Sequence, residues 1–338
     1  MDDDNPPEDG LGEKFADLGR AIAPFVPKFP NLRKVQQRLL GDVPDAAFGA
    51  LVARLRLSQA RSQSEAITTL VERTGLPPAV AYEMVTKQER LDGLVGPALA
   101  RIAHDPDPST ESTQTDAVTD DDWFEVYRRE AADRGEGEMR AAFIRVLEGE
   151  IRKPGTFSVH ALRILGTIST RTAERFRRAA SVAISKDNDT RVPAVNGGLG
   201  NNCLRDIGLS YDVLTELTEN GLVRPDYGSR MPYGPIHEAT SVQELPPNLQ
   251  LPFQHQSRWW ALVGTTEETK VKALRVQGAA FTVAGRELLS VVDLEPLPEF
   301  TERLKAHFVK SKYEMREAPA GRSFFHWGEP RPHRDGQG

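Results

Sequence analysis

The segment from His104 to Asp121 constrains the fold of this chain more than any other stretch. It consists mainly of Asp, Ser, Thr and Pro, and almost none of its side chains could join a hydrophobic core. Such a composition predicts a linker over residues 104–121. The chain has 338 residues, more than one typical domain. We therefore expect separately folded parts on either side of the linker.

The part before the linker has the periodicity of helices. Residues 1–12 are acidic and contain Pro and Gly, which predicts a disordered tail. From there on, apolar residues recur at spacings of three and four, as on one face of a helix. One such face combines Phe48, Leu51, Val52 and Leu55. We predict a helical N-terminal region over residues 13–103.

The part that follows the linker begins with helix signals. Asp122 has the position of an N-cap, and Ser158 is a second one. Phe157 and Leu162 flank Ser158 at the spacing of a hydrophobic staple, in which two apolar side chains close over the first helical turn. These signals predict a three-helix unit over residues 122–182.

The remainder mixes short helices with strands. Ser210 is a predicted N-cap, and Leu222-Val223 follows that helix as the start of a strand. Thr282-x-x-Gly285-x-x-Leu288 predicts another short helix further on. This order is typical of a winged-helix-like α+β domain, which we place at residues 183–316. The fold class is therefore mainly α with an α+β C-terminal part.

Three further stretches of this C-terminal part carry predictions. Residues 224–257 contain six prolines and predict a long loop. Residues 291–294 predict a strand, and Phe300, Leu304 and Phe308 predict a closing helix because they are spaced by four. The Pro-, Gly-, His- and Arg-rich residues 317–338 predict a flexible tail.

Four motifs follow one another between residues 121 and 158. They are Asp121-Asp122-Trp123-Phe124, Gly137-Glu138-Met139-Arg140, Leu147-Glu148-Gly149-Glu150 and Pro154-Gly155-Thr156-Phe157-Ser158. The run resembles an uncharacterised bacterial family that carries only a domain-of-unknown-function label, and the resemblance covers about residues 120–290. A more distant similarity to the abortive-infection alpha proteins rests on residues 214–223 and 281–288. The resemblance implies a bacterial accessory protein of phage defence or mobile elements, and it implies no reaction.

Charge is distributed unevenly along the chain. The net charge is −6, yet residues 140–180 carry nine Lys or Arg against three Glu. Residues 1–120 alone carry a formal charge of −6. A locally basic helical unit could therefore bind phosphates, or it could form a solvated surface or pair with the acidic N-terminal part. The candidate binding residues are Arg171, Arg175 and Arg178, which share one helix face, together with Arg152 and Lys153.

Two adjacent tryptophans, Trp259 and Trp260, lie in a predicted strand. Neighbouring strand residues point to opposite faces of a sheet, so we expect one of the pair inside and the other outside. The outer tryptophan is a candidate for an interface.

Residues with the spacing of catalytic or metal sites were not found. Cys203 is the single cysteine, and the seven histidines do not cluster. Gly197-Gly198-Leu199-Gly200 lacks the Lys-Ser/Thr ending of a phosphate-binding loop. The acidic run Asp120–Asp122 with Glu125 is better explained by helix capping than by a metal. We therefore predict no catalytic residue, no metal and no cofactor.

Location and function are predicted together from these observations. The single cysteine favours a reducing cytosol, and no apolar stretch reaches the length of a membrane span. We expect a cytoplasmic, non-enzymatic bacterial accessory protein of the phage-defence or mobile-element type, which binds a protein or a nucleic acid. The alternative is a DNA-binding transcriptional regulator that uses the basic helix at residues 170–178 and a C-terminal wing.

Overall fold

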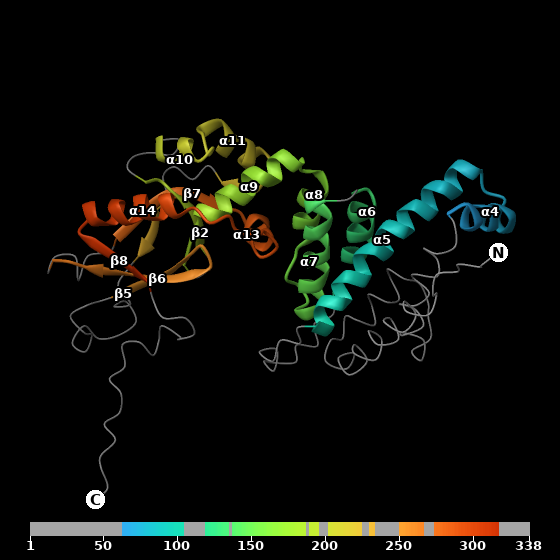
Figure 1. Ribbon diagram of the computed structural model, residues 1–338, viewed down its shortest axis with the longest axis horizontal. Coiled ribbons are helices and arrows are strands. Elements are labelled where there is room, and N and C mark those ends of the chain that lie inside the picture. Colours follow the sequence, from blue (N-terminus) through green and yellow to red (C-terminus); the bar gives the residue numbers. More distant parts are fainter. Residues whose placement is uncertain are drawn as a thin grey trace, which may run out of the picture. The chain divides into compact units, whose positions relative to one another are not determined.

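A computed structural model of the chain is shown in Figure 1. Several predicted features lie outside the described residues. They are the N-terminal tail, the helix face at residues 48–55, the glycine run at 197–200, most of the 104–121 linker and all but the first residue of the C-terminal tail. The chain divides into a first compact unit, residues 1–170, and a second, residues 171–338. The structure describes residues 63–104, 119–134, 137–186, 189–195, 202–224, 230–233, 250–266 and 274–317.

The first unit is helical throughout its described residues. Helix α5 packs against α4, α6 and α7, and α6 packs against α8. The α4 helix ends where Gly75 adopts a φ of 69° and donates its N–H to the Val71 carbonyl at 2.8 Å. The helices are α4 (Gln63–Thr74), α5 (Pro78–His104), α6 (Asp121–Ala132), α7 (Glu138–Arg152) and α8 (Val159–Thr167).

Side-chain caps begin two of these helices. The Ser158 hydroxyl accepts the Ala161 N–H at 3.1 Å, and the staple residues Phe157 and Leu162 are both buried, which confirms that prediction. At α6 the cap is Asp120, which accepts the Asp122 N–H at 3.3 Å, so the prediction of Asp122 as N-cap was wrong by two residues. A run of three aspartates offers three caps, and only the backbone decides among them.

Aromatic side chains fill the core of the first unit. Trp123 and Tyr127 stack one turn apart on α6, with ring centroids 5.2 Å apart. The Trp123 indole N–H donates to the Phe157 carbonyl at 2.8 Å, and the Tyr127 hydroxyl donates to the Phe143 carbonyl at 3.0 Å. Burial raises the pKa of Tyr127 far above its ordinary value, because a phenolate there would lose its hydration. Each polar atom that these rings bring into the core therefore has a partner.

The second unit is built on one antiparallel sheet. Its strand order is β3-β7-β2-β1-β5-β6-β8, and β4 also pairs with β7. The strands are β1 (Ile184–Lys186), β2 (Asp189–Pro193), β3 (Val223–Arg224), β4 (Arg230–Tyr233), β5 (Gln250–His255), β6 (Arg258–Gly264), β7 (Leu274–Phe281) and β8 (Tyr313–Glu317). The helices are α9 (Thr170–Val182), α10 (Asn202–Asp206), α11 (Tyr211–Glu219), α13 (Val283–Leu289) and α14 (Pro298–Lys310).

Half of this sheet has the connections of a winged helix. Its elements are α9, β2, α10, α11, β3 and β7, and β7 pairs between β2 and β3. Along the chain, β1 comes between α9 and β2, and β4, β5 and β6 come between β3 and β7. This arrangement agrees with the predicted winged-helix-like part, and the fold class is mainly α with an α+β C-terminal part. Thr282 caps α13 by accepting the Gly285 N–H at 2.9 Å. Gly285 lies against β3, since a Cβ there would come within 2.1 Å of the Leu222 carbonyl oxygen. The Thr282-x-x-Gly285 motif therefore joins α13 closely to β3.

The other half of the sheet extends the winged helix. Strands β5 and β6 form a hairpin, and the two turn residues Gln256 and Ser257 have φ of 50° and 59°. Helix α14 packs on this half, with Phe308 6.0 Å from Phe253 between ring centroids. Figure 1 shows α14 in red beside β8.

Two predictions for this unit were wrong. Strands β4 and β5 lie inside residues 224–257, which had been predicted as one loop. Pro252 in β5 pairs with Ala261 of β6 and lies beyond the two residues that pair with β1, and prolines in sheets are found mainly at such edges. Residues 291–294 form no strand, because this segment connects α13 to α14 and the following Glu295 N–H bonds to the Ser181 hydroxyl at 2.7 Å. None of the described helices has the length and apolar composition needed to cross a membrane.

Candidate functional site

The motif that carries the family resemblance closes a turn of the first unit. Glu150 at the end of α7 is 1% exposed. Its Oε1 accepts the Thr119 hydroxyl at 2.8 Å and the Gly155 N–H at 2.7 Å. Its Oε2 accepts the Phe157 N–H at 3.1 Å. One buried carboxylate thus connects the start of α6, the end of α7 and the turn into α8.

The other residues of this motif serve the same turn. Gly149 leaves room for Phe157, whose ring would lie 2.7 Å from a Cβ at position 149. Gly155 has a φ of 79°, which favours glycine. Phe157 is buried, and Ser158 caps α8. We conclude that the motif specifies a fold feature rather than a reactive site.

The predicted arginine face lies on α9, and two of its three members form ion pairs within the second unit. Arg175 pairs with Glu216 of α11, and Arg178 Nε lies 3.9 Å from Glu295 Oε2. Glu216 also accepts the Thr172 hydroxyl at 2.9 Å. Arg171, at the start of the helix, is exposed. Internal carboxylates therefore offset much of the positive charge on this face.

Arg152 and Lys153 lie at the end of α7, which belongs to the first unit. The Arg152 guanidinium binds Glu148 at 3.0 Å, and Glu148 also lies 3.5 Å from Arg101. Lys153 follows the helix and is exposed. The structure thus distributes the five basic candidates over two units.

Helix α11 stands where the recognition helix of a winged helix stands. It is the second helix of the pair α10 and α11, and in DNA readers the N-terminal residues of that helix contact bases. In this chain those residues are Tyr211, which is 53% exposed, and Asp212, which is also exposed. Glu219 is exposed at the other end, and the helix sequence contains three acidic residues and no basic one. This exposed face of α11 is negative.

The tryptophan pair divides as strand alternation predicts. Trp260 is 7% exposed, and its indole N–H donates to the His255 carbonyl at 3.2 Å. The Lys305 ammonium lies over its ring, 5.4 Å from the centroid. Trp259 is 36% exposed. The outer residue of the pair is therefore Trp259.

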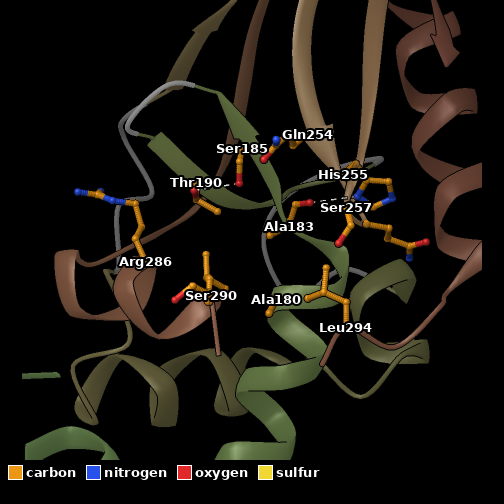
Figure 2. Close-up of a pocket in the computed structure, with 12 residues that line it drawn as sticks. Ala180, Ala183, Ser185, Thr190, Gln254, His255, Ser257, Arg286, Ser290 and Leu294 are labelled. Atoms are coloured by element: carbon orange, nitrogen blue, oxygen red, sulfur yellow. Dashed lines mark hydrogen bonds between the residues drawn. The ribbon is translucent and has the colours of Figure 1, made fainter. Parts of the chain in front are cut away.

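A depression of about 470 Å³ lies beside the β5–β6 turn. Figure 2 shows Ser185 and Thr190 joined by a hydrogen bond on one side of it and His255 on the other, with Arg286 at its edge. Its polar side chains are mainly neutral hydroxyls and amides. They are Ser185, Thr190, Gln254, Gln256, Ser257 and Ser290.

His255 is the one histidine of this depression, and both of its ring nitrogens are used within the protein. Nδ1 lies 3.0 Å from the Ala183 carbonyl oxygen, which can only accept, so Nδ1 carries the proton. Nε2 then accepts the Thr301 hydroxyl at 3.0 Å. Burial lowers the pKa of His255, which favours this neutral form. The ring ties β5 to α14 and to the residue after α9, and it offers no free nitrogen to a substrate.

A second depression, of about 480 Å³, adjoins the first and shares Gln256, Ser257 and Leu294 with it. Its apolar lining consists of Trp260, Leu294, Pro296 and Pro298. Charged side chains surround this lining, namely Arg258, Glu295, Glu302, Lys305 and Glu317. We call this cavity the Trp260 depression.

Among the side chains that line the two depressions, Trp260 alone belongs to the candidate binding residues predicted from the sequence. Both depend on strand β5, which the proline-rich composition of residues 224–257 concealed. The alternation of buried Phe253 and His255 with exposed Gln254 was the available signal. Among the residues that the structure describes, no group of three or more His, Cys, Asp or Glu is placed to hold a metal ion.

Comparisons with known proteins give a family without a function. Neither the search of curated proteins nor the search of solved structures found a match. A family model described as "Protein of unknown function (DUF2806)" matches residues 82–305, more than half of the chain. This match confirms the resemblance to an uncharacterised family that the motifs indicated. The chain therefore belongs to the DUF2806 family of proteins of unknown function.

Proposed function

We propose that this chain is a non-enzymatic bacterial accessory protein, of the phage-defence or mobile-element type, that binds a protein partner through its winged-helix unit. The observation that carries the proposal is the negative face of α11. A recognition helix that enters a DNA groove meets closely spaced phosphates, so acidic residues at its N-terminus are repelled there. The same face, with the exposed Tyr211 beside the Asp212 carboxylate, suits a protein interface.

The ion pairs of α9 support a protein partner as well. Arg175 and Arg178 would have to leave Glu216 and Glu295 before they could neutralise phosphates. Each such exchange replaces an ion pair that already exists, so its net gain is small. The resemblance to abortive-infection alpha proteins suggests the biological setting.

Phage plaquing on the host tests the proposal. Deleting the gene should raise plaquing, and the wild-type chain should restore protection. A Tyr211→Ala/Asp212→Ala variant should not restore it, because the α11 face has lost its anchor and its charge. An Arg171→Ala/Lys153→Ala variant is the matched control, with two exposed residues changed elsewhere, and should protect like wild type. Unchanged plaquing of the deletion strain across a broad phage panel would refute the defence role.

The DNA-binding regulator is the second candidate, and the winged-helix connections together with exposed Arg171 favour it. It predicts binding of duplex DNA whose affinity falls steeply between about 50 and 200 mM salt. The steepness of this fall is roughly proportional to the number of phosphates that the protein contacts. Fluorescence anisotropy would measure this, with the Arg171→Ala/Arg175→Ala/Arg178→Ala variant as the test of the basic face. Salt-sensitive binding that this variant loses would replace our proposal with the regulator.

A further inference from the structure

The Trp260 depression has an apolar lining and an acidic rim. Trp260, Leu294, Pro296 and Pro298 supply the apolar side chains. Three carboxylates and two cations surround them, so the rim carries a net negative charge. Glu302 and Glu317 expose 69% and 52% of their side chains to solvent. Its volume of about 480 Å³ lies within the usual range of ligand sites.

The described chain ends at this depression. Strand β8 is the edge strand beside β6, and its last residue, Glu317, is itself part of the lining. Residues 318–338 continue from this point. Extended chain advances about 3.3 Å per residue, so the six residues from Glu317 to Ser323 span up to about 20 Å. The residues that follow Arg322 can therefore reach any point of the depression.

The sequence of those residues matches the chemistry of the depression. Arg322-Ser323-Phe324-Phe325-His326-Trp327 places three large aromatic side chains within four positions. Aromatic rings prefer the company of other rings and apolar groups over water. Lys305 pairs with Glu302 and Arg258 with Glu317, so the third carboxylate leaves the rim with one net negative charge. Arg322 supplies a positive charge directly before the rings, which complements this net charge.

From this placement we propose that the Trp260 depression is a peptide-docking site that binds the aromatic segment Ser323–Trp327 of the same chain. The rings of Phe324 and Trp327 contact the lining around Trp260 and the two prolines. The Arg322 guanidinium lies at the carboxylates of the rim. This inference concerns a site apart from the α11 face, so it does not depend on the proposed function.

Disulfide trapping in the full chain tests the proposal. Cys203 is the single cysteine, so a Cys203→Ser background has no thiol. Into it we would introduce Ser257→Cys at the exposed β5–β6 turn, and Ser323→Cys in the segment. The rate at which an intrachain disulfide forms under mild oxidation, read by mass spectrometry, then reports how often the segment occupies the depression.

Two further substitution pairs make the test specific. Adding Phe324→Ser and Trp327→Ser should slow the intrachain disulfide about tenfold, because the effective concentration of the segment at the site falls. Adding Arg331→Ser and His333→Ser, in the same tail but beyond the rings, should leave the rate unchanged. Equal rates with and without the rings would overturn the proposal. A disulfide formed mainly between two chains would also overturn it and would indicate a second copy as the source of the segment.

Discussion

Replacing Glu150 by glutamine should destabilise the first unit, although the two side chains have the same shape. Two donors, the Thr119 hydroxyl and the Gly155 N–H, point at Oε1, and the Phe157 N–H points at Oε2. A glutamine can satisfy the first pair with its oxygen, but its NH₂ group then faces the Phe157 N–H. One charge-assisted bond is lost and one buried donor stays unsatisfied, which costs about 1–3 kcal/mol.

The Glu150→Ala variant extends this reasoning. It leaves all three donors without an acceptor in a site that is 1% exposed, so the expected loss is about 3 kcal/mol or more. Urea unfolding of the full chain measures both variants. Near-UV circular dichroism reports on Trp123, whose indole bonds to the same turn at the Phe157 carbonyl. The free energy of unfolding should fall in the order wild type, Glu150→Gln, Glu150→Ala.

Glu148 provides the matched control on the same helix. It pairs with Arg152 and Arg101 and keeps 19% of its side chain exposed. Both Arg152 hydrogen bonds go to one oxygen of Glu148, and a glutamine oxygen can still accept them, so Glu148→Gln should cost less stability than Glu150→Gln. If Glu150→Gln unfolded at the same urea concentration as Glu148→Gln, the role we assign to the buried carboxylate would be refuted.

Two other predictions concern His255 and Gly285 in the second unit, and Gly96 in the first unit serves as a comparison for the second of them. Burial lowers the pKa of His255 below its ordinary 6.5, so the unfolded chain binds a proton more readily than the folded one. The contribution of neutral His255 to the free energy of unfolding is therefore complete above pH 6.5. It is lost as the pH falls, by up to about 1.4 kcal/mol per pH unit. The urea midpoint should drop between pH 7.5 and 5.5, less so in His255→Gln than in a control that replaces the exposed histidine of α8, His160→Gln; equal drops would contradict this assignment. Gly285→Ala should lower the melting temperature, because its Cβ would lie 2.1 Å from the Leu222 carbonyl oxygen. Gly96 lies inside α5 with open space around it, so Gly96→Ala should stabilise the helix by up to about 1 kcal/mol and raise the melting temperature. If Gly285→Ala raised the melting temperature as well, the close contact between α13 and β3 would not constrain position 285.

Features that depend on nearby residues could be predicted from the sequence. The Ser158 and Thr282 hydroxyls each accept an N–H from three residues ahead, so cap and donor stand close together in the chain. The division of Trp259 and Trp260 between the two faces follows from strand alternation alone. Such signals need no knowledge of the rest of the fold.

Features that depend on distant partners could not be predicted. The helix face that carries Arg175 was readable, but its partner Glu216 comes from another helix, and Glu295 of the Arg178 pair follows more than a hundred residues later. Strand β5 pairs with β1 through His255 and Ile184, whose separation along the chain no periodicity reveals. Both depressions beside the β5–β6 turn depend on that pairing.

The place of β7 in the sheet has a consequence for synthesis of the protein. Strand β2 ends at Pro193, and β7, which completes the winged-helix half, begins only at Leu274. On the ribosome, α9, α10 and α11 therefore emerge well before the strand that joins β2 to β3. Until residue 281 leaves the exit tunnel, both strands present unpaired edges. A ribosome that stalls after β3 has left the tunnel and before β7 has done so would thus hold a nascent chain prone to aggregation, and ribosome-bound chaperones should bind it most strongly in that interval.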